Sequence, residues 1–130
     1  GEFNKEGLYK GYLSKDSNTN KVTVTSNKTS DDCDLIETEY KLLEYKNNTS
    51  LVSVHLITGK SHQIRAHMAY LGFPIIGDNK YGNKKLSSEF NKKYQMLHAY
   101  KIIFPKYDDE LSFDFSGKTF ICEPQFRLSL

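Results

Sequence analysis

Alternation of apolar and polar positions dominates the first half of the chain and predicts strands there. Residues 21–26 alternate β-branched and polar side chains, and residues 51–57 form the strongest strand pattern of all. Residues 9–14 form a short apolar run, and residues 36–46 alternate less cleanly but are bounded by turns. The Asn-Asn pair at 47–48 indicates a hairpin turn. Together these four segments predict an antiparallel meander.

The pattern changes to a helical period over residues 61–71. Apolar side chains recur there on one face at about 100° per residue, namely at Ile64, Met68 and Leu71. Ser61 is a suitable N-cap, and Gly72 is a suitable residue just beyond the last turn. Pro74 then stops the helix. This segment is the main helix that the sequence predicts.

The last third of the chain carries weaker signals. Residues 86–93 indicate a short helix, and residues 97–104 and 111–115 read as a strand pair. Residues 119–122 indicate a last strand. We therefore expect an α+β fold, with a mixed, mainly antiparallel sheet and one main helix.

Length and composition narrow the function classes. The chain has 130 residues, enough for one domain, and its net charge of +2 excludes a strongly basic nucleic-acid coat. No apolar run approaches the roughly 20 residues that span a bilayer. Cys33 and Cys122 cannot form a disulfide framework and read as reduced thiols of a cytoplasmic protein. The opening residues 1–3 resemble a cloning scar, so we begin the domain at residue 4.

The predicted helix carries the most unusual residues. Its polar face holds His62, Arg65, Ala66 and Ala69, and the alanines leave room for a close approach by a ligand or another backbone. Arginine is rare in this chain, with only Arg65 and Arg127 among 18 basic residues. A guanidinium holds a carboxylate or phosphate bidentately, as lysine cannot. The alternative is an ordinary solvated helix arginine.

Other candidate chemistry finds little support. The loop 58–61 enters the helix with free N–H groups that attract anions, but many helices begin this way. His62 and His67 are five residues apart and do not share a metal, so no metal site is expected. Asp78 follows Gly77 in what is usually turn chemistry. A lysine-rich stretch from residue 80 to 93 indicates either a basic patch or a solvated loop.

Residues 56–68 read LITGKSHQIRAHM, which resembles the L-x-T-G-[RK]-x-H-Q-I-R-x-H-[LM] signature of RluA-type pseudouridine synthases. The resemblance continues through LGFPIIGD at 71–78, YG at 81–82 and LHA at 97–99. Upstream, T-E-Y at 38–40 and GYLSKD at 11–16 also resemble family segments. The match covers roughly residues 8–115 in register.

The resemblance implies RNA chemistry on part of the pseudouridine synthase fold. Such enzymes isomerise uridine to pseudouridine in ribosomal or transfer RNA, flip the target base out of the helix and use no metal or organic cofactor. Their essential aspartate lies in an H-R-L-D motif, and its partner is the arginine that matches Arg65. Leu97 matches an apolar residue that lines the uracil pocket. Lys60 and His62 match positions near the active-site helix.

The chain lacks the H-R-L-D motif and the K-x-R-Y segment that precede this region in the family. We therefore expect residues 4–130 to be the C-terminal part of a catalytic domain, inactive alone. The alternative is a standalone, non-catalytic RNA-binding domain; a hydrolase with His62 or His67 as base lacks a paired nucleophile. No membrane partner is expected. Exposed strand edges predict self-association.

Overall fold

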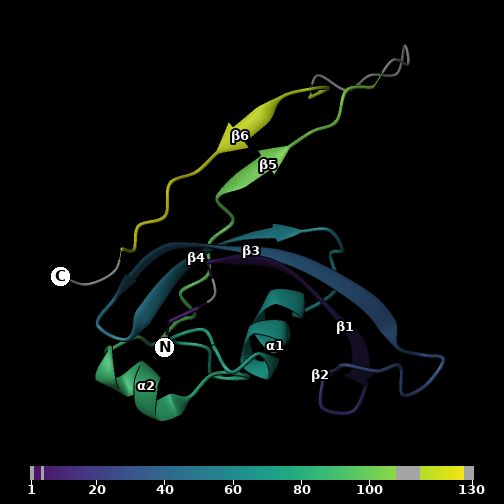
Figure 1. Ribbon diagram of the computed structural model, residues 1–130, viewed down its shortest axis with the longest axis horizontal. Coiled ribbons are helices and arrows are strands. Elements are labelled where there is room, and N and C mark those ends of the chain that lie inside the picture. Colours follow the sequence, from purple (N-terminus) through teal and green to yellow (C-terminus); the bar gives the residue numbers. More distant parts are fainter. Residues whose placement is uncertain (1, 4, 108–114, 128–130) are drawn as a thin grey trace. The chain divides into compact units, whose positions relative to one another are not determined.

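The computed structural model describes residues 2–3, 5–107 and 115–127, which form two compact units. One unit contains the described residues as far as Met96, and the other contains those from Leu97 to Arg127. Within them, mainly antiparallel strands accompany two short helices (Figure 1). The predicted α+β class is confirmed. No helix in the described ranges is long and apolar enough to cross a membrane.

The first unit is built on an antiparallel sheet of four strands. They are β1 (Glu6–Asp16), β2 (Lys21–Thr25), β3 (Asp34–Lys46) and β4 (Thr49–Leu56). Their order in the sheet is β2-β1-β3-β4, so the predicted meander is wrong although the four strands are antiparallel. The strand β1 is long enough to pair with β2 through Tyr12–Asp16 and with β3 through Glu6–Leu13. The polar loop 26–33 carries the chain from one side of β1 to the other.

The hairpin between β3 and β4 forms where the Asn-Asn pair predicts it. Asn47 and Asn48 have φ values of 49° and 58°, and a two-residue hairpin loop with both angles positive matches the right-handed twist of the strands. Asparagine tolerates this left-handed conformation better than other side chains with a Cβ atom. In β3, before the turn, the register with β4 shifts between Leu42 and Glu44, which is typical of a β-bulge.

The main helix, α1 (Gln63–Tyr70), is shorter than predicted and is capped differently at its start. Its N-cap is His62, which has a φ of 58°, and not Ser61. The side chain of His62 makes no capping hydrogen bond. The side chain of Gln63 instead fixes the loop before the helix, because its Oε1 accepts the backbone N–H of Lys60 at 2.9 Å. Helix propensity alone does not reveal such a reach-back from the first helical residue.

The C-terminal end of α1 follows the prediction. Gly72 has a φ of 86° and donates its N–H to Ala69 O at 3.1 Å, and Phe73 donates to Met68 O at 2.9 Å. These two bonds form a Schellman motif, which requires the left-handed conformation that glycine adopts without strain.

Two clusters of buried side chains hold α1 against the sheet, which arches over it in Figure 1. The first consists of Leu13, Val22, Val24, Ile36 and Ala66. The second consists of Phe3, Tyr40 and Met68, with Ile64, Leu71 and Phe73 packed around them. The predicted apolar face of the helix therefore does line the core.

Two core residues stand out against the expectations. The sequence places Ala66 on a polar face with room for a ligand or another backbone, whereas the structure buries it in the first cluster, because α1 buries two stripes of residues. Phe3 belongs to the segment left out as a cloning scar, yet only 3% of it is exposed. Its ring lies 4.8 Å from the Phe73 ring and 5.6 Å from the Tyr40 ring, both edge-on, so it is a core residue.

The second helix, α2 (Lys84–Glu89), begins two residues before the predicted segment and ends four residues earlier. Asn83 sets its start, because the side-chain Oδ1 accepts the N–H groups of Lys85 at 2.9 Å and Leu86 at 3.3 Å. Asn91, with a φ of 49°, marks the chain reversal after its end.

The second unit contains a two-stranded antiparallel pair, β5 (Lys101–Ile103) and β6 (Thr119–Ile121). The predicted last strand is therefore confirmed. The predicted strand at 97–104 is confirmed only in part, because residues 97–100 are not in strand conformation. Its partner is β6 and not the segment 111–115, of which residues 111–114 lie outside the described ranges.

Candidate functional site

Arg65 is held by a buried carboxylate that lies 13 residues further along the chain. From the middle of α1 its Nε donates to Asp78 Oδ2 at 2.7 Å, and its Nη2 donates to Asp78 Oδ1 at 2.9 Å. The Asp78 side chain is 0% exposed and that of Arg65 is 20% exposed. This is the bidentate geometry that guanidinium and carboxylate groups favour, and it fixes the plane of the guanidinium.

The predicted role of Arg65 is therefore changed in one respect. We expected its partner to be an aspartate that this chain lacks, and the structure shows a resident partner. A guanidinium has five N–H donors, and Asp78 receives two of them. Among the described residues the other three have no hydrogen-bond acceptor. The arginine is thus anchored on one side and still able to donate on the other.

Asp78 was dismissed as turn chemistry, and the structure gives it two roles. Its Oδ1 accepts the backbone N–H groups of Lys80 at 2.9 Å and Tyr81 at 3.0 Å, which is turn chemistry. The same carboxylate binds Arg65. Burial alone would raise the pKa of Asp78, but the hydrogen bonds from Arg65 and from the two N–H groups outweigh it and lower the pKa to about 2.

Tyr81 covers the pair and connects it to the sheet and to the start of α1. The Arg65 Cζ lies 5.2 Å from the centre of the Tyr81 ring, within range of a cation–π contact. The Tyr81 hydroxyl accepts the N–H of Val22 in β2 at 3.0 Å and lies 2.9 Å from His62 Nδ1. Because the hydroxyl already accepts from Val22, its own hydrogen is available to His62.

His62, at the start of α1, is part of this cluster. Burial lowers the pKa of His62, and the nearby positive charges of Arg65 and Lys80 lower it further. A neutral imidazole is therefore favoured, and its Nδ1 accepts the hydrogen of the Tyr81 hydroxyl in the arrangement inferred from the network. The ring of His62 therefore acts as a hydrogen-bonding group.

Gln63 locks the loop before α1 onto β3. Its Nε2 donates to Glu37 O at 3.2 Å and to Thr38 Oγ1 at 2.9 Å. Its Oε1 accepts from the Thr58 hydroxyl at 3.0 Å and from the Lys60 N–H at 2.9 Å. All four hydrogen-bonding positions of the buried amide are filled, which makes this residue a structural clamp that sequence reasoning missed.

His67 is fully buried beneath the same clamp. The Thr38 hydroxyl accepts from Gln63 and is hydrogen-bonded to His67 Nδ1 at 3.3 Å. Burial lowers the pKa of His67. A wholly buried neutral imidazole cannot act as a base on a substrate. This excludes His67 as the base in the hydrolase alternative. The predicted hydrogen-bonding role of this histidine is confirmed.

The two other predicted site residues are Lys60 and Leu97. Lys60 extends from the loop before α1 to Asp34, with its Nζ 2.7 Å from the carboxylate, and both side chains are about half exposed. Leu97 begins the second unit and is half-buried there. No group of three or more metal-binding side chains occurs among the described residues. The site is therefore Arg65, Asp78, Tyr81 and His62.

Comparison with known proteins gives one consistent result. The model of the RNA pseudouridylate synthase family matches residues 1–70. An uncharacterized RNA pseudouridine synthase of Mycoplasma genitalium is 38% identical over 82% of this chain and 33% of its own length. Ribosomal large subunit pseudouridine synthase C of Rickettsia bellii is 51% identical over 53% of this chain and 23% of its own length. The chain thus spans a third or less of these curated relatives.

A solved structure shows the same fold. The protein named Human RNA Pseudouridylate Synthase Domain Containing 1 superposes with a TM-score of 0.65. The superposition covers 78% of this chain and 44% of the human chain, at 23% sequence identity. At that identity the likeness concerns the fold alone.

Proposed function

We propose, since this chain belongs to the RNA pseudouridylate synthase family, that it works as part of an enzyme that isomerises uridine to pseudouridine in ribosomal or transfer RNA. The family match includes α1 and therefore Arg65. Because the chain spans a third or less of the curated relatives, the activity belongs to a longer protein. In that protein this chain forms the C-terminal part of a cytoplasmic catalytic domain.

The reaction needs a carboxylate that this chain does not supply for itself. The glycosidic C1′–N1 bond breaks, the uracil turns, and a C1′–C5 bond forms. The proton that leaves C5 is balanced by one that N1 takes up, so the isomerisation needs no oxidant or reductant. The nucleophile that we assign is the aspartate of an H-R-L-D segment, which is absent from these 130 residues. Asp78 is not a substitute, because its side chain is fully buried and its two oxygens already receive four N–H groups.

The role of this chain is to present Arg65 to that aspartate. The observation that carries this assignment is the bidentate bond to Asp78, which fixes the guanidinium plane and leaves three N–H donors without an acceptor among the described residues. A charge-assisted hydrogen bond from Arg65 would orient the incoming carboxylate and keep it ionised. Asp78 is thus a positioning residue. Leu97, Lys60 and His62 are proposed to contact the substrate or its backbone.

The test compares the chain with the longer protein that contains an H-R-L-D segment. Each is incubated with unmodified ribosomal RNA, and pseudouridine is measured by mass spectrometry of the digested nucleosides. We expect turnover from the longer protein and none from this chain. Comparable turnover from the chain alone would contradict the assignment of the nucleophile.

The two arginines provide a matched pair of variants in the longer protein. Arg65→Lys keeps the charge but loses the planar fork, so we expect about a 100-fold loss of turnover, the scale of a small misplacement in an active site. Arg127→Lys changes an exposed residue of the second unit and should leave turnover unchanged. RNA binding without turnover by the longer protein would favour the alternative, a non-catalytic RNA-binding domain.

A further inference from the structure

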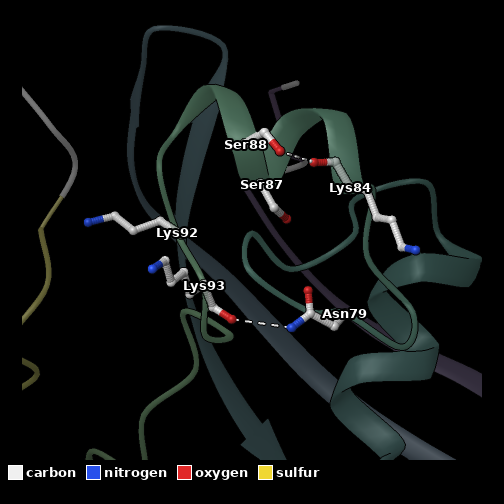
Figure 2. A pocket seen from close by; sticks show the side chains of 6 residues that line it. All are labelled: Asn79, Lys84, Ser87, Ser88, Lys92 and Lys93. Atoms are coloured by element: carbon white, nitrogen blue, oxygen red, sulfur yellow. Dashed lines mark hydrogen bonds between the residues drawn. The ribbon is translucent and has the colours of Figure 1, made fainter.

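A lysine-lined hollow lies beside α2 and has no role in the site described above. Residues 79–93 contain five lysines and one glutamate. Within this segment the structure has an open hollow of about 310 Å³. It is lined by Asn79, Lys84, Ser87, Ser88, Lys92 and Lys93, as Figure 2 shows.

No ion pair among the described residues neutralises the positive charges around the hollow. Ion pairs elsewhere in the described ranges engage Lys10, Lys28 and Lys60. None of them involves Lys84, Lys92 or Lys93, all of which are exposed. In Figure 2 Ser87 lies between the Lys84 side chain on one side and the two other lysines on the opposite side. Positive groups on both sides suit an extended anion better than a single compact one.

The floor of the hollow is held in place by hydrogen bonds. Ser87, only 6% exposed, accepts the N–H of Gly77 at 2.9 Å, and its carbonyl accepts the N–H of Lys92 at 2.9 Å. Asn79 Nδ2 donates to Lys93 O at 3.2 Å. Among the described residues, the hydroxyl hydrogen of Ser87 has no acceptor. The hollow therefore combines a fixed polar floor, a free donor and a positive rim.

The floor and the Arg65 site share one turn of the chain. Gly77 and Asn79, which bond to the elements around the hollow, are the neighbours of Asp78, which binds Arg65. The residues that hold the floor of the hollow are therefore direct chain neighbours of Asp78 in the proposed catalytic centre. A strand of nucleic acid in the hollow would lie next to that turn. This continuity favours RNA over an unrelated anion.

We propose that this hollow binds the phosphodiester backbone of the RNA substrate beside the modified nucleotide, an inference that rests on the proposed function. Lys84 on one side and Lys92 and Lys93 on the other would contact successive phosphates. The Ser87 hydroxyl would donate to a phosphate or a 2′-hydroxyl oxygen at the floor. The contact positions the strand and carries no information about its sequence.

The test measures binding of a fluorescein-labelled, single-stranded, uridine-rich oligoribonucleotide to this chain by anisotropy, over a series of salt concentrations. The variant Lys92→Gln/Lys93→Gln is compared with Lys5→Gln/Lys41→Gln. The latter removes two exposed neighbouring lysines, one just before β1 and the other within β3 opposite the first residue of β1. Each phosphate contact to a single strand contributes about 0.7 to the salt slope. We therefore expect the first variant to lower the slope by about 1.4 and weaken binding about 25-fold at roughly 0.1 M salt.

The control pair should leave the slope and the affinity close to those of the unmodified chain. Equal losses in both variants would overturn the proposal, because they would show unspecific attraction to charge. Displacement of the RNA by inorganic phosphate at constant ionic strength would also overturn it, since the hollow would then hold a free anion. No RNA binding at all would overturn the hollow's role, whereas the proposed function is judged separately by turnover in the longer protein.

Discussion

Replacing Asp78 by asparagine tests the central pair of the site directly. The substitution keeps the shape of the side chain, and its remaining oxygen can still accept N–H groups from the turn. It removes the negative charge and places an amide N–H₂ against the donors of Arg65, where the carboxylate now accepts two hydrogen bonds. Because the Asp78 side chain is fully buried, water cannot replace the lost partner without rearrangement.

The magnitude follows from the pKa. An ordinary aspartate pKa of 3.8 and a folded-state pKa of about 2 differ by an amount that corresponds to about 2 kcal/mol at neutral pH. Leaving a partly buried Arg65 unpaired adds to this, and broken buried pairs cost about 3–5 kcal/mol in total. We therefore expect Asp78→Asn to lower the free energy of unfolding by about 2–5 kcal/mol at neutral pH.

The pH dependence carries the sharper test. A carboxyl whose pKa is lowered by folding stabilises the protein above its unfolded pKa, and this stabilisation is lost as the pH falls through the folded value. The difference in free energy of unfolding between the unmodified protein and Asp78→Asn should shrink between about pH 5 and pH 2. Nearly half of the contribution from ionised Asp78 should be lost at about pH 3. Urea unfolding followed by circular dichroism measures it.

The control is Asp31→Asn, because Asp31 is fully exposed and pairs only with Lys28 across one turn. A change within about 0.5 kcal/mol is expected for it. The reasoning is refuted if Asp78→Asn costs less than about 1 kcal/mol at neutral pH, or if its cost is the same at about pH 3.

Three further predictions concern other parts of the chain. Gly77→Ala should lower the stability of the fold by more than about 4 kcal/mol in thermal melts, because φ is 79° and a Cβ atom would lie 1.9 Å from Tyr94 O. A Cβ atom at Gly59 would meet no atom within 4 Å, so the control Gly59→Ala should leave the stability unchanged. Gln63→Leu should lower the free energy of unfolding in urea by about 3 kcal/mol, since it leaves buried polar groups unpaired. A decrease below about 1 kcal/mol would contradict the role of Gln63 as a clamp. Iodoacetamide should alkylate Cys33 with a half-maximal rate at about pH 7, because hydrogen bonds with the neighbouring Ser and Thr hydroxyls lower its thiol pKa to about 7. A midpoint near the usual value of about 8.5 would contradict these hydrogen bonds.

The parts of the fold that local chemistry decides could be predicted from the sequence. The Asn-Asn hairpin and the end of α1 at Gly72 each depend on residues adjacent in the chain that tolerate positive φ. The order of the strands depends instead on which edges of β1 are free to pair, and alternation does not show that. Periodicity therefore predicted the strands but not their neighbours.

The burial of α1 exceeded the prediction for a related reason. A helical pattern of apolar residues reveals one buried face, here the one that contains Met68. The second stripe consists of Gln63, Ala66 and His67, two of which are polar side chains. They are buried because β3 offers hydrogen-bond partners such as Thr38 at matching positions. Only the tertiary structure brings those partners together, so composition along the helix suggested a solvated face.

The site shows the same division between local and distant signals. Arg65 stands out in the sequence because arginine is scarce, whereas its partner looked like an ordinary Gly-Asp turn. A buried and an exposed turn aspartate can have the same local sequence. They differ in the residues from distant parts of the chain that contact them. One signal was available: Asp78 follows the apolar pair Ile75 and Ile76, so its turn begins from a partly buried segment.

The scarcity of arginine acquires a physical reason from this pair. A lysine ammonium could neutralise Asp78, but it is a point charge and cannot also present donors in a fixed plane to a second carboxylate. Arg65 uses its Nε and Nη2 edge for Asp78, which leaves Nη1 to face another group without releasing the first. The Tyr81 ring against the guanidinium further limits its rotation. A protein otherwise rich in lysine therefore needs arginine at this position if a second carboxylate is to be held there. In the longer protein, Arg65→Lys should lose turnover while the fold, anchored through Gln63, survives.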